Sequence, residues 1–397
     1  MLDHVSVVMN QPIKTGANPK TAPPVSLVQI LKVVSSDIKR LESQIFRDVQ
    51  TNIPLLNNVA EHILNSGGKR LRPALVLLGA KMFGGVDERV MKAAQVIEYL
   101  HTATLLHDDV VDGAETRRAK QAACRLWGNE VSVLSGDFLL AMAFYRLTKL
   151  RNPEVLELMS DTTTRMARGE LLQLTRSFKS VNEEEYLEII INKTACLFAT
   201  AIKTGALLAG ASGKSVNLLY DYGMAIGVSF QIVDDALDYS DEVKTGKPVG
   251  GDLQERKITL PLNHLMEQAN VTDRKSLDLI LSQSIIDKPE IEEVKTGKPV
   301  GGDLQERKIT LPLSHLLENV NVSDNKRLHS ILSQTEIEKP QIDEVIGLMQ
   351  CYGSIAYAIT HAKQYAVEAQ RSIENFPETD LRQSLADIAD YIVSHHA

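Results

Sequence analysis

The sequence is poor in cysteine and in aromatic residues, and it carries no excess of positive charge. Its three cysteines (Cys124, Cys196 and Cys351) show no CxxC pair and no metal-ligand spacing, so we expect reduced thiols in a cytoplasmic protein. The net charge of −8 argues against nucleic acid or an anionic membrane as the main partner. No apolar run approaches the length that a transmembrane helix needs, so we expect no transmembrane segment.

Helical periodicity runs through most of the 397 residues. Apolar residues recur three and four positions apart, and no run alternates in the way that a half-buried strand does. We therefore expect an all-α protein, a single large helical bundle with apolar helices in its middle. Residues 1–24 contain several prolines and no arginine, which is typical of a flexible N-terminal tail. The helical domain is expected over 25–397.

Asp108, Asp109 and Asp112 close an apolar helical stretch, QVIEYLHTATLLHDDVVD. Positions i and i+4 share a helix face, so Asp108 and Asp112 project side by side. Crowded carboxylates resist ionisation, and the C-terminal end of a helix disfavours negative charge. An arrangement so unfavourable for packing is typical of oxygen ligands for Mg²⁺, which is commonly shared with substrate phosphates.

The same Asp-Asp-x-x-Asp pattern returns at Asp234, Asp235 and Asp238, again at the end of an apolar helix. By composition alone, two such copies would arise on the order of once in several hundred chains. We expect the two acidic helix ends to face each other across a cavity and to hold Mg²⁺ around a diphosphate.

Cationic side chains accompany both triplets. Lys69 and Arg72 lie in the turn SGGKRLRP, and Arg117 and Arg118 follow the first triplet. An arginine can grip a diphosphate through two parallel hydrogen bonds; a solvated basic turn and simple salt bridges are the alternatives. His101 lies two turns before the first triplet, and a lone histidine on a helix is more often structural.

Other polar residues lie near the second triplet or inside apolar helices. Lys247 and Lys257 add positive charge just past the second triplet, whereas Lys193, Thr194 and Gln231 interrupt apolar helices. A lysine in a core is costly unless it is paired. Lys193 therefore needs an anion, and a diphosphate would serve.

Together these residues resemble the trans-type prenyl diphosphate synthases, most closely the bacterial long-chain polyprenyl class. The resemblance runs from about residue 27 to the C-terminus and rests on six motifs in order: GGKRLRP (67–73), LLHDDVVDGAETRR (105–118), GNEVSVLSGDFLL (128–140), KTACLF (193–198), FQIVDDALDY (230–239) and GKPVGGDL…KITLPL (246–262). It implies an isoprenoid-synthase bundle around a central cavity, usually a homodimer. It also implies that Mg²⁺ assists the condensation of isopentenyl diphosphate with an allylic diphosphate, farnesyl or geranylgeranyl diphosphate.

The resemblance also implies a role for each residue singled out above. Mg²⁺ on the allylic diphosphate would be held by Asp108, Asp109, Asp112, Asp234 and Asp235, supported by Asp238. The same diphosphate would be bound by Arg117, Lys193, Lys247 and Lys257. Isopentenyl diphosphate would be held by Lys69, Arg72, His101 and Arg118. The developing allylic cation would face Thr194 and Gln231.

Product length depends on the helix that carries the first triplet. Short-chain members of the family commonly carry aromatic residues four and five positions before the triplet, where this sequence has Thr104 and Ala103. Small residues leave a tunnel open, which predicts a product of roughly C30–C50. The floor of the tunnel is left open between Met159, Leu156 and Phe144. Alternatives are a geranylgeranyl diphosphate synthase, a non-catalytic partner subunit and a terpene cyclase; the two intact triplets argue against the last two.

A tandem duplication interrupts the family pattern. EVKTGKPVGGDLQERKITLPL occurs twice, letter for letter, and looser similarity makes 293–343 a second copy of 242–292. One copy is surplus, since 346 residues without it would be a normal family length. We expect the first copy to function, because its spacing from Asp238 matches the family, and the second to be a surface insertion of small entropic cost. The converse assignment and an error of gene assembly are the alternatives.

Overall fold

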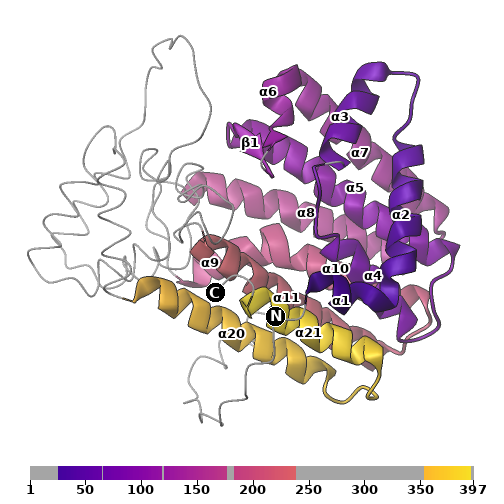
Figure 1. The fold of residues 1–397 in the computed structure, drawn as a ribbon, viewed down its shortest axis with the longest axis vertical. Helices are drawn as coiled ribbons and strands as arrows, with labels where there is room; N and C mark the ends of the chain where they lie inside the picture. Colours follow the sequence, from indigo (N-terminus) through magenta and orange to yellow (C-terminus); the bar gives the residue numbers. More distant parts are fainter. Residues whose placement is uncertain (1–25, 65, 119, 177–182, 238–352, 395–397) are drawn as a thin grey trace, which may run out of the picture.

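The computed structural model describes residues 26–64, 66–118, 120–176, 183–237 and 353–394. The expectations for the tail 1–24, for both copies of the repeat and for Asp238, Lys247 and Lys257 lie outside these residues. Helices make up most of the described chain (Figure 1). The prediction of an all-α bundle is confirmed.

The N-terminal helices form where the sequence supplies their caps. Ser26 and Gln29 make a reciprocal capping box at the first helix, and Pro54 occupies the first turn of α3, where its missing N–H costs nothing. The elements are α1 (Leu27–Ile30), a 3₁₀ turn η3 (Leu31–Val34), α2 (Ser35–Asp48), α3 (Pro54–Leu64) and α4 (Leu71–Lys81).

Helix α5 (Glu88–Val111) carries the first Asp triplet through the core. Asp87 caps it by accepting from the backbone N–H groups of Arg89 and Val90, both at 2.9 Å. The helix packs closely against α7 (Asn129–Lys149) and also contacts α4. Between α5 and α7 the chain forms α6 (Ala123–Trp127) and an antiparallel ribbon of two-residue strands, β1 (Thr116–Arg117) and β2 (Lys120–Gln121). The strands were not predicted, because two residues are too few to show an alternation of apolar and polar side chains.

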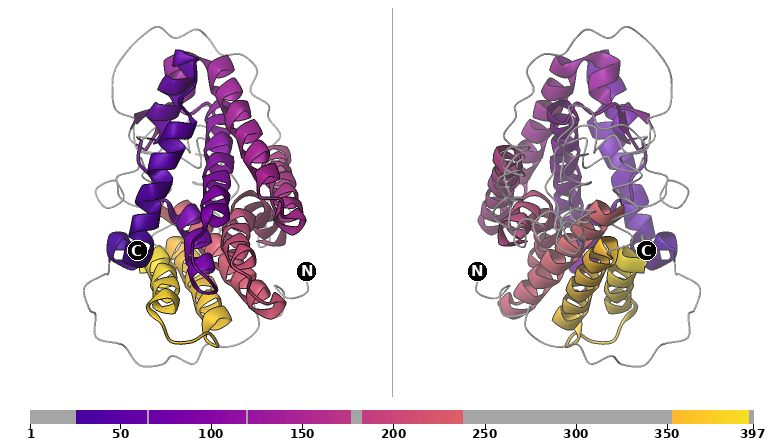
Figure 2. Two further views of the ribbon diagram at one scale, coloured as in Figure 1. Left: turned by 90° about the vertical axis from the view of Figure 1, so that its right-hand side faces the viewer. Right: turned by 90° about the vertical axis from the view of Figure 1, so that its left-hand side faces the viewer.

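The second half of the bundle is built around α10 (Cys196–Leu208), which contacts α4, α5, α8 and α11. Figures 1 and 2 show α20 lying alongside α11, with α21 next to it. Two buried hydroxyls join these helices: Tyr222 donates to the Leu385 carbonyl at 2.7 Å, and Ser229 donates to the Ala362 carbonyl at 2.9 Å. The remaining elements are α8 (Pro153–Arg176), α9 (Glu183–Ile190), a π-helical turn η4 (Ile191–Ala195), α11 (Gly213–Leu237), α20 (Ser354–Ile373) and α21 (Asp380–Ser394).

Helix α7 corrects one expectation. An 18-residue stretch of this helix has a mean hydropathy of 1.3. Among the described residues, α7 is the one helix that is long and apolar enough to cross a membrane by length and composition alone. The expectation that no run approaches this length is therefore wrong. About a third of this stretch (33%) is buried in the fold, and a core helix can meet the same criterion.

Candidate active site

The first acidic helix end divides its carboxylates between two environments. Asp108 and Asp112 are partly buried and one turn apart on α5, and the Asp112 N–H donates to the Asp108 carbonyl at 2.7 Å. Asp109 is buried and accepts from Nε of Arg117 at 2.7 Å. For Arg117, the structure therefore contains the salt bridge that was weighed as the alternative to phosphate binding. Asp108 and Asp112 keep the shared face that the sequence predicts.

The second acidic helix end shows the same division. Asp234 is partly buried, whereas Asp235 is buried with both carboxylate oxygens hydrogen-bonded. Tyr186 of α9 donates to one oxygen at 2.6 Å, and the Gln231 amide donates to the other at 2.8 Å. Gln231 in turn accepts from the Thr194 hydroxyl at 2.8 Å. The two residues expected to face the allylic cation are thus joined to each other and anchored on Asp235.

These carboxylates fit a metal that is shared with a substrate better than one enclosed by protein. In the part of the chain that the structure describes, no three His, Cys, Asp or Glu side chains come close enough together to hold a metal. Mg²⁺ is usually bound through one or two carboxylates plus phosphate oxygens and water. The donor set of Asp108 and Asp112 fits that requirement.

Arg72 lies at the centre of a basic cluster. Its guanidinium lies 4.4 Å from the centre of the Phe198 ring and 5.9 Å from that of Phe230, and it contacts Nε2 of His101 at 3.2 Å. Burial lowers the pKa of Arg72 to about 10. Its Nε is buried and meets no hydrogen-bond partner among the described residues. A cation desolvated in this way is stabilised by an incoming anion.

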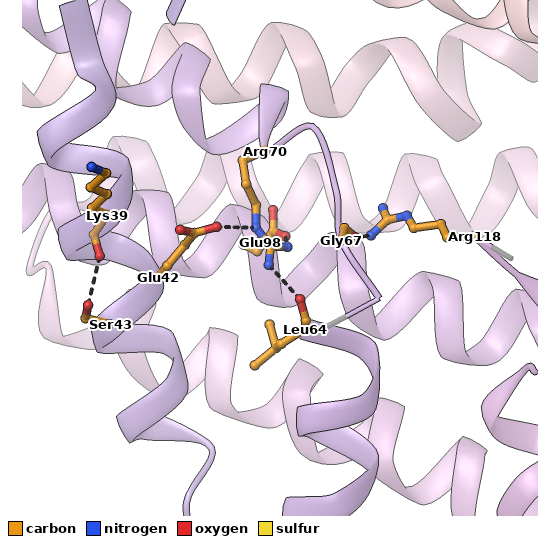
Figure 3. A network of polar contacts seen from close by, with 8 residues as sticks. All are labelled: Lys39, Glu42, Ser43, Leu64, Gly67, Arg70, Glu98 and Arg118. Carbon is orange, nitrogen blue, oxygen red and sulfur yellow. Dashed lines mark hydrogen bonds and ion pairs between the residues drawn. The ribbon is translucent and has the colours of Figure 1, made fainter. Parts of the chain in front are cut away.

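His101 is neutral in this environment. Burial of the imidazole, followed by the positive charges of Arg72 and Arg118, lowers the pKa of His101 well below its ordinary value. Arg118 crosses to the turn before α4, where its Nη1 donates to the Gly67 carbonyl (Figure 3). A Cβ at Gly68 would lie 2.8 Å from that nitrogen, so a larger residue there would displace the end of the Arg118 side chain.

The two acidic ends lie around this one cluster. Asp234 of α11 is close enough to Arg72 to raise its pKa, and Asp109 of α5 has the same effect on Arg118. The charge of Arg118 in turn acts on Arg72. Charges from both acidic helix ends therefore act on the same group of arginines.

Lys193 has an anion that the sequence did not predict. It lies in the π-helical turn η4, and Glu170 of α8 forms an ion pair with it. Helix α8 can approach because residue 169 is glycine; a Cβ there would lie 2.6 Å from the Lys193 backbone nitrogen. Single π-helical turns inside α-helices are frequent at functional sites. The core lysine is thus paired inside the chain.

Other predicted residues fall in several places. Ala103 is buried on α5, and partly buried Thr104 donates to the His101 carbonyl at 2.9 Å. Lys69 is exposed, and its ammonium lies 5.2 Å from the centre of the Tyr391 ring on α21. Of the three candidate floor residues, Met159 is buried, Phe144 is partly buried and Leu156 is exposed.

Sequence reasoning missed several residues around the cluster. The two rings beside Arg72 occur within motifs that were noted for their polar members, and Glu98 is a buried acid in an apolar stretch of α5. A charged residue at an otherwise apolar position was a usable signal. The partners of Glu98, Glu170 and Tyr186 could not be predicted from spacing, because each partner lies on another element than the residue that it contacts.

Comparisons with known proteins identify the family of the chain. Residues 53–295 match the family model described as polyprenyl synthetase. The octaprenyl diphosphate synthase of Haemophilus influenzae is 32% identical over 366 residues, which is 92% of this chain and 95% of the relative. The heptaprenyl diphosphate synthase component 2 of Bacillus subtilis is 37% identical over 267 residues, covering 66% of this chain and 76% of the relative.

A solved structure shares the fold over nearly the whole length. The polyprenyl synthase of Caulobacter crescentus, complexed with calcium and isoprenyl diphosphate, superposes with a TM-score of 0.76 and 31% identity, covering 95% of this chain and all of that one (100%). Fold and site together define an all-α protein with two acidic helix ends around a basic cluster. The chain belongs to the polyprenyl synthetase family, the trans-type prenyl diphosphate synthases. The resemblance predicted from the motifs is confirmed, and with it the assignment as a prenyltransferase.

Proposed function

We propose that the chain joins isopentenyl diphosphate to an allylic diphosphate and releases a long all-trans polyprenyl diphosphate. The observation that carries the proposal is the cluster of Arg72, His101 and Arg118 between the carboxylates of two helices. The octaprenyl and heptaprenyl names of the relatives support a long product, as does the small side chain at Ala103.

A divalent cation, which we take to be Mg²⁺, fits the donors on both helix ends. Asp108 and Asp112 would hold it from α5, and Asp234 would hold it from α11. When bound, Mg²⁺ neutralises charge that develops on a departing diphosphate. The calcium bound in the Caulobacter crescentus relative supports a divalent ion at such a site.

The side chains of this chain bind and orient the two substrates. Arg117 and Lys193 bind the allylic diphosphate, each from a position where a carboxylate now pairs with it. Arg72, Arg118 and the neutral His101 bind isopentenyl diphosphate, assisted by Lys69, so that its double bond is held beside the allylic carbon. Lys247 and Lys257 would add charge at the allylic diphosphate.

The condensation then needs little further chemistry from the protein. As the allylic C–O bond breaks, the double bond of isopentenyl diphosphate forms the new C–C bond, and the proton lost from the resulting cation passes to the released diphosphate. The oxygens of Thr194 and Gln231 face the carbon where positive charge develops. An apolar cavity that excludes water would protect the cation from hydrolysis.

Incorporation of labelled isopentenyl diphosphate, with and without Mg²⁺, tests the proposal. We expect Mg²⁺-dependent extension of farnesyl diphosphate beyond geranylgeranyl diphosphate. A product that stops at geranylgeranyl diphosphate would contradict the long-chain part. The name of the Bacillus subtilis relative, a component 2, favours one second candidate, a subunit that works with a partner. No incorporation by the purified chain, restored by a partner subunit, would establish that candidate.

We also propose a homodimer, built on the apolar faces of α7 and α8. Large hydrophobic side chains are exposed on both helices: Val133, Leu134 and Tyr145 on α7, and Leu156, Leu171 and Leu174 on α8. Exposed apolar surface of this kind marks interaction sites. Light scattering should give a dimer mass, which Leu134→Asp should reduce to that of a monomer.

We propose that the protein is cytoplasmic. The buried free thiols of Cys124 and Cys196 suit that compartment.

We propose that the first repeat copy, 242–292, supplies the lysines of the site. Deletion of 293–343 should then leave the fold and the activity intact. Lys247→Ala with Lys257→Ala should abolish activity in the full chain, whereas the matched changes Lys298→Ala and Lys308→Ala in the second copy should leave it intact. The opposite result would assign the site to the second copy instead.

A further inference from the structure

A buried ion pair lies directly behind the basic cluster. Glu98 of α5 is 4% exposed, and its carboxylate pairs with the guanidinium of Arg70, whose side chain is 11% exposed (Figure 3). Arg70 also donates from Nη2 to the Leu64 carbonyl at 3.1 Å and from Nε to Glu42 at 3.2 Å. One side chain therefore joins α2, the end of α3 and α5.

Arg70 also fixes the turn on which two predicted substrate-binding residues lie. Its backbone is left-handed, with φ of 47°, a conformation that is unfavourable for a residue with a Cβ. Lys69 precedes it and Arg72 follows it by two positions, at the start of α4. The contacts of the Arg70 side chain hold this unfavourable backbone, and the directions of both neighbouring cations depend on it.

Glu98 connects this anchor with the rest of the cluster. It lies one turn before His101 on the same face of α5, and His101 contacts Arg72. The negative charge of Glu98 also raises the pKa of Arg72 and of Arg118. A buried carboxylate thus faces three arginines, with only Arg70 in direct ionic contact.

We infer that Glu98 is a positioning residue for isopentenyl diphosphate: through Arg70 it fixes the turn that presents Lys69 and Arg72. The inference rests on the proposed function, because it takes this cluster to be the isopentenyl diphosphate site. Glu98 itself touches no substrate. Its carboxylate sets the geometry of residues that do.

The alternative role for Glu98 predicts the opposite result. If the carboxylate acted only as a counter-ion, its removal would leave more positive charge in the cluster, and a diphosphate would bind more tightly. If it positions the turn, its removal releases Arg70, and binding weakens. The sign of the change in affinity therefore decides between the two roles.

The test compares Glu98→Gln with Glu42→Gln, which removes the other carboxylate on the same guanidinium. Glu42 has a side chain that is 48% exposed, and exposed pairs contribute little. We expect Glu98→Gln to raise the KM for isopentenyl diphosphate at least tenfold while the KM for the allylic diphosphate changes less than twofold. Glu42→Gln should change both less than twofold. An unchanged or lowered KM for isopentenyl diphosphate in Glu98→Gln would overturn the inference.

A double variant separates positioning from folding. Breaking one side of a buried ion pair destabilises a protein, whereas replacing both sides with apolar residues is often neutral. We expect Arg70→Met with Glu98→Leu to melt near the wild-type temperature and still show the raised KM. A wild-type KM in this double variant would refute the inference even if Glu98→Gln failed to fold.

Calorimetry with isopentenyl diphosphate distinguishes failure of the inference from failure of the proposed function. Binding by the wild type and equal binding by Glu98→Gln would refute the inference alone. A wild-type chain that binds no isopentenyl diphosphate would refute the proposed function, and with it the inference.

Discussion

Tyr186→Phe should destabilise the fold more than the same substitution at an equally buried tyrosine elsewhere. The Tyr186 hydroxyl donates to the Asp235 carboxylate at 2.6 Å, and the side chain is 0% exposed. A hydrogen bond to a charged group contributes about 1.5–3 kcal/mol, against about 1 kcal/mol for a neutral pair. Tyr222 is the matched control, because it is also 0% exposed and its hydroxyl donates to a neutral backbone carbonyl at 2.7 Å.

Urea denaturation followed by circular dichroism measures both variants. We expect Tyr186→Phe to lower the free energy of unfolding by about 2 kcal/mol and Tyr222→Phe by about 1 kcal/mol. Because Gln231 bonds the same carboxylate, Tyr186→Phe should also lower kcat, which Tyr222→Phe should leave unchanged. Equal losses of stability in the two variants would refute the claim that Tyr186 satisfies a charged group.

Three further results are expected. Asp234→Asn should raise the Mg²⁺ concentration for half-maximal activity at least tenfold, whereas Asp235→Asn should mainly lower the melting temperature, since both of its oxygens are already hydrogen-bonded; equal Mg²⁺ dependence would contradict this. Gly68→Ala should raise the KM for isopentenyl diphosphate roughly fivefold, the equivalent of one displaced hydrogen bond of about 1 kcal/mol, because its Cβ would meet Arg118; an unchanged KM would show that the turn can yield. The lowered pKa of His101 means that below about pH 6.5 the unfolded chain binds a proton that the folded chain excludes, so the fold becomes less stable as the pH is lowered. In His101→Asn the urea midpoint should depend less steeply on pH than in the wild type. The same dependence in both would contradict the shift.

The helices and both acidic ends could be predicted from the sequence because they depend on local spacing. An apolar period of 3.6 residues gives α5 and α11, and the cap Asp87 gives the start of α5. The π-helical turn at Ile191–Ala195 could not be predicted in this way, because it interrupts the helical period between α9 and α10. A π-helical turn holds one extra residue, so the faces on either side of Lys193 are rotated relative to a continuous helix. Its partner Glu170 could not have been predicted from an unbroken 3.6 period.

The roles within the acidic triplets could not be predicted either, because they depend on tertiary contacts. Asp109 and Asp235 occupy the same position in the two copies of the pattern, and both are buried and hydrogen-bonded by other side chains. In each helix the residue before them is only partly buried. A repeated motif therefore contains two kinds of carboxylate, one buried and hydrogen-bonded by other side chains and one only partly buried. The spacing alone cannot distinguish the two kinds, because both are aspartates.

The charges around Arg72 explain why the site favours an anion before one arrives. Two neighbouring arginines have carboxylate partners, Arg70 with Glu98 and Arg117 with Asp109. Arg72 contacts instead two aromatic rings and an imidazole that burial and the neighbouring arginines keep neutral. Ring faces stabilise a cation by about 0.5–2 kcal/mol, less than the cost of its desolvation, which is visible in the lowered pKa of Arg72. A diphosphate would supply the missing charge. Ion pairs around Arg72 hold the geometry, and we propose that the substrate neutralises the charge at the centre.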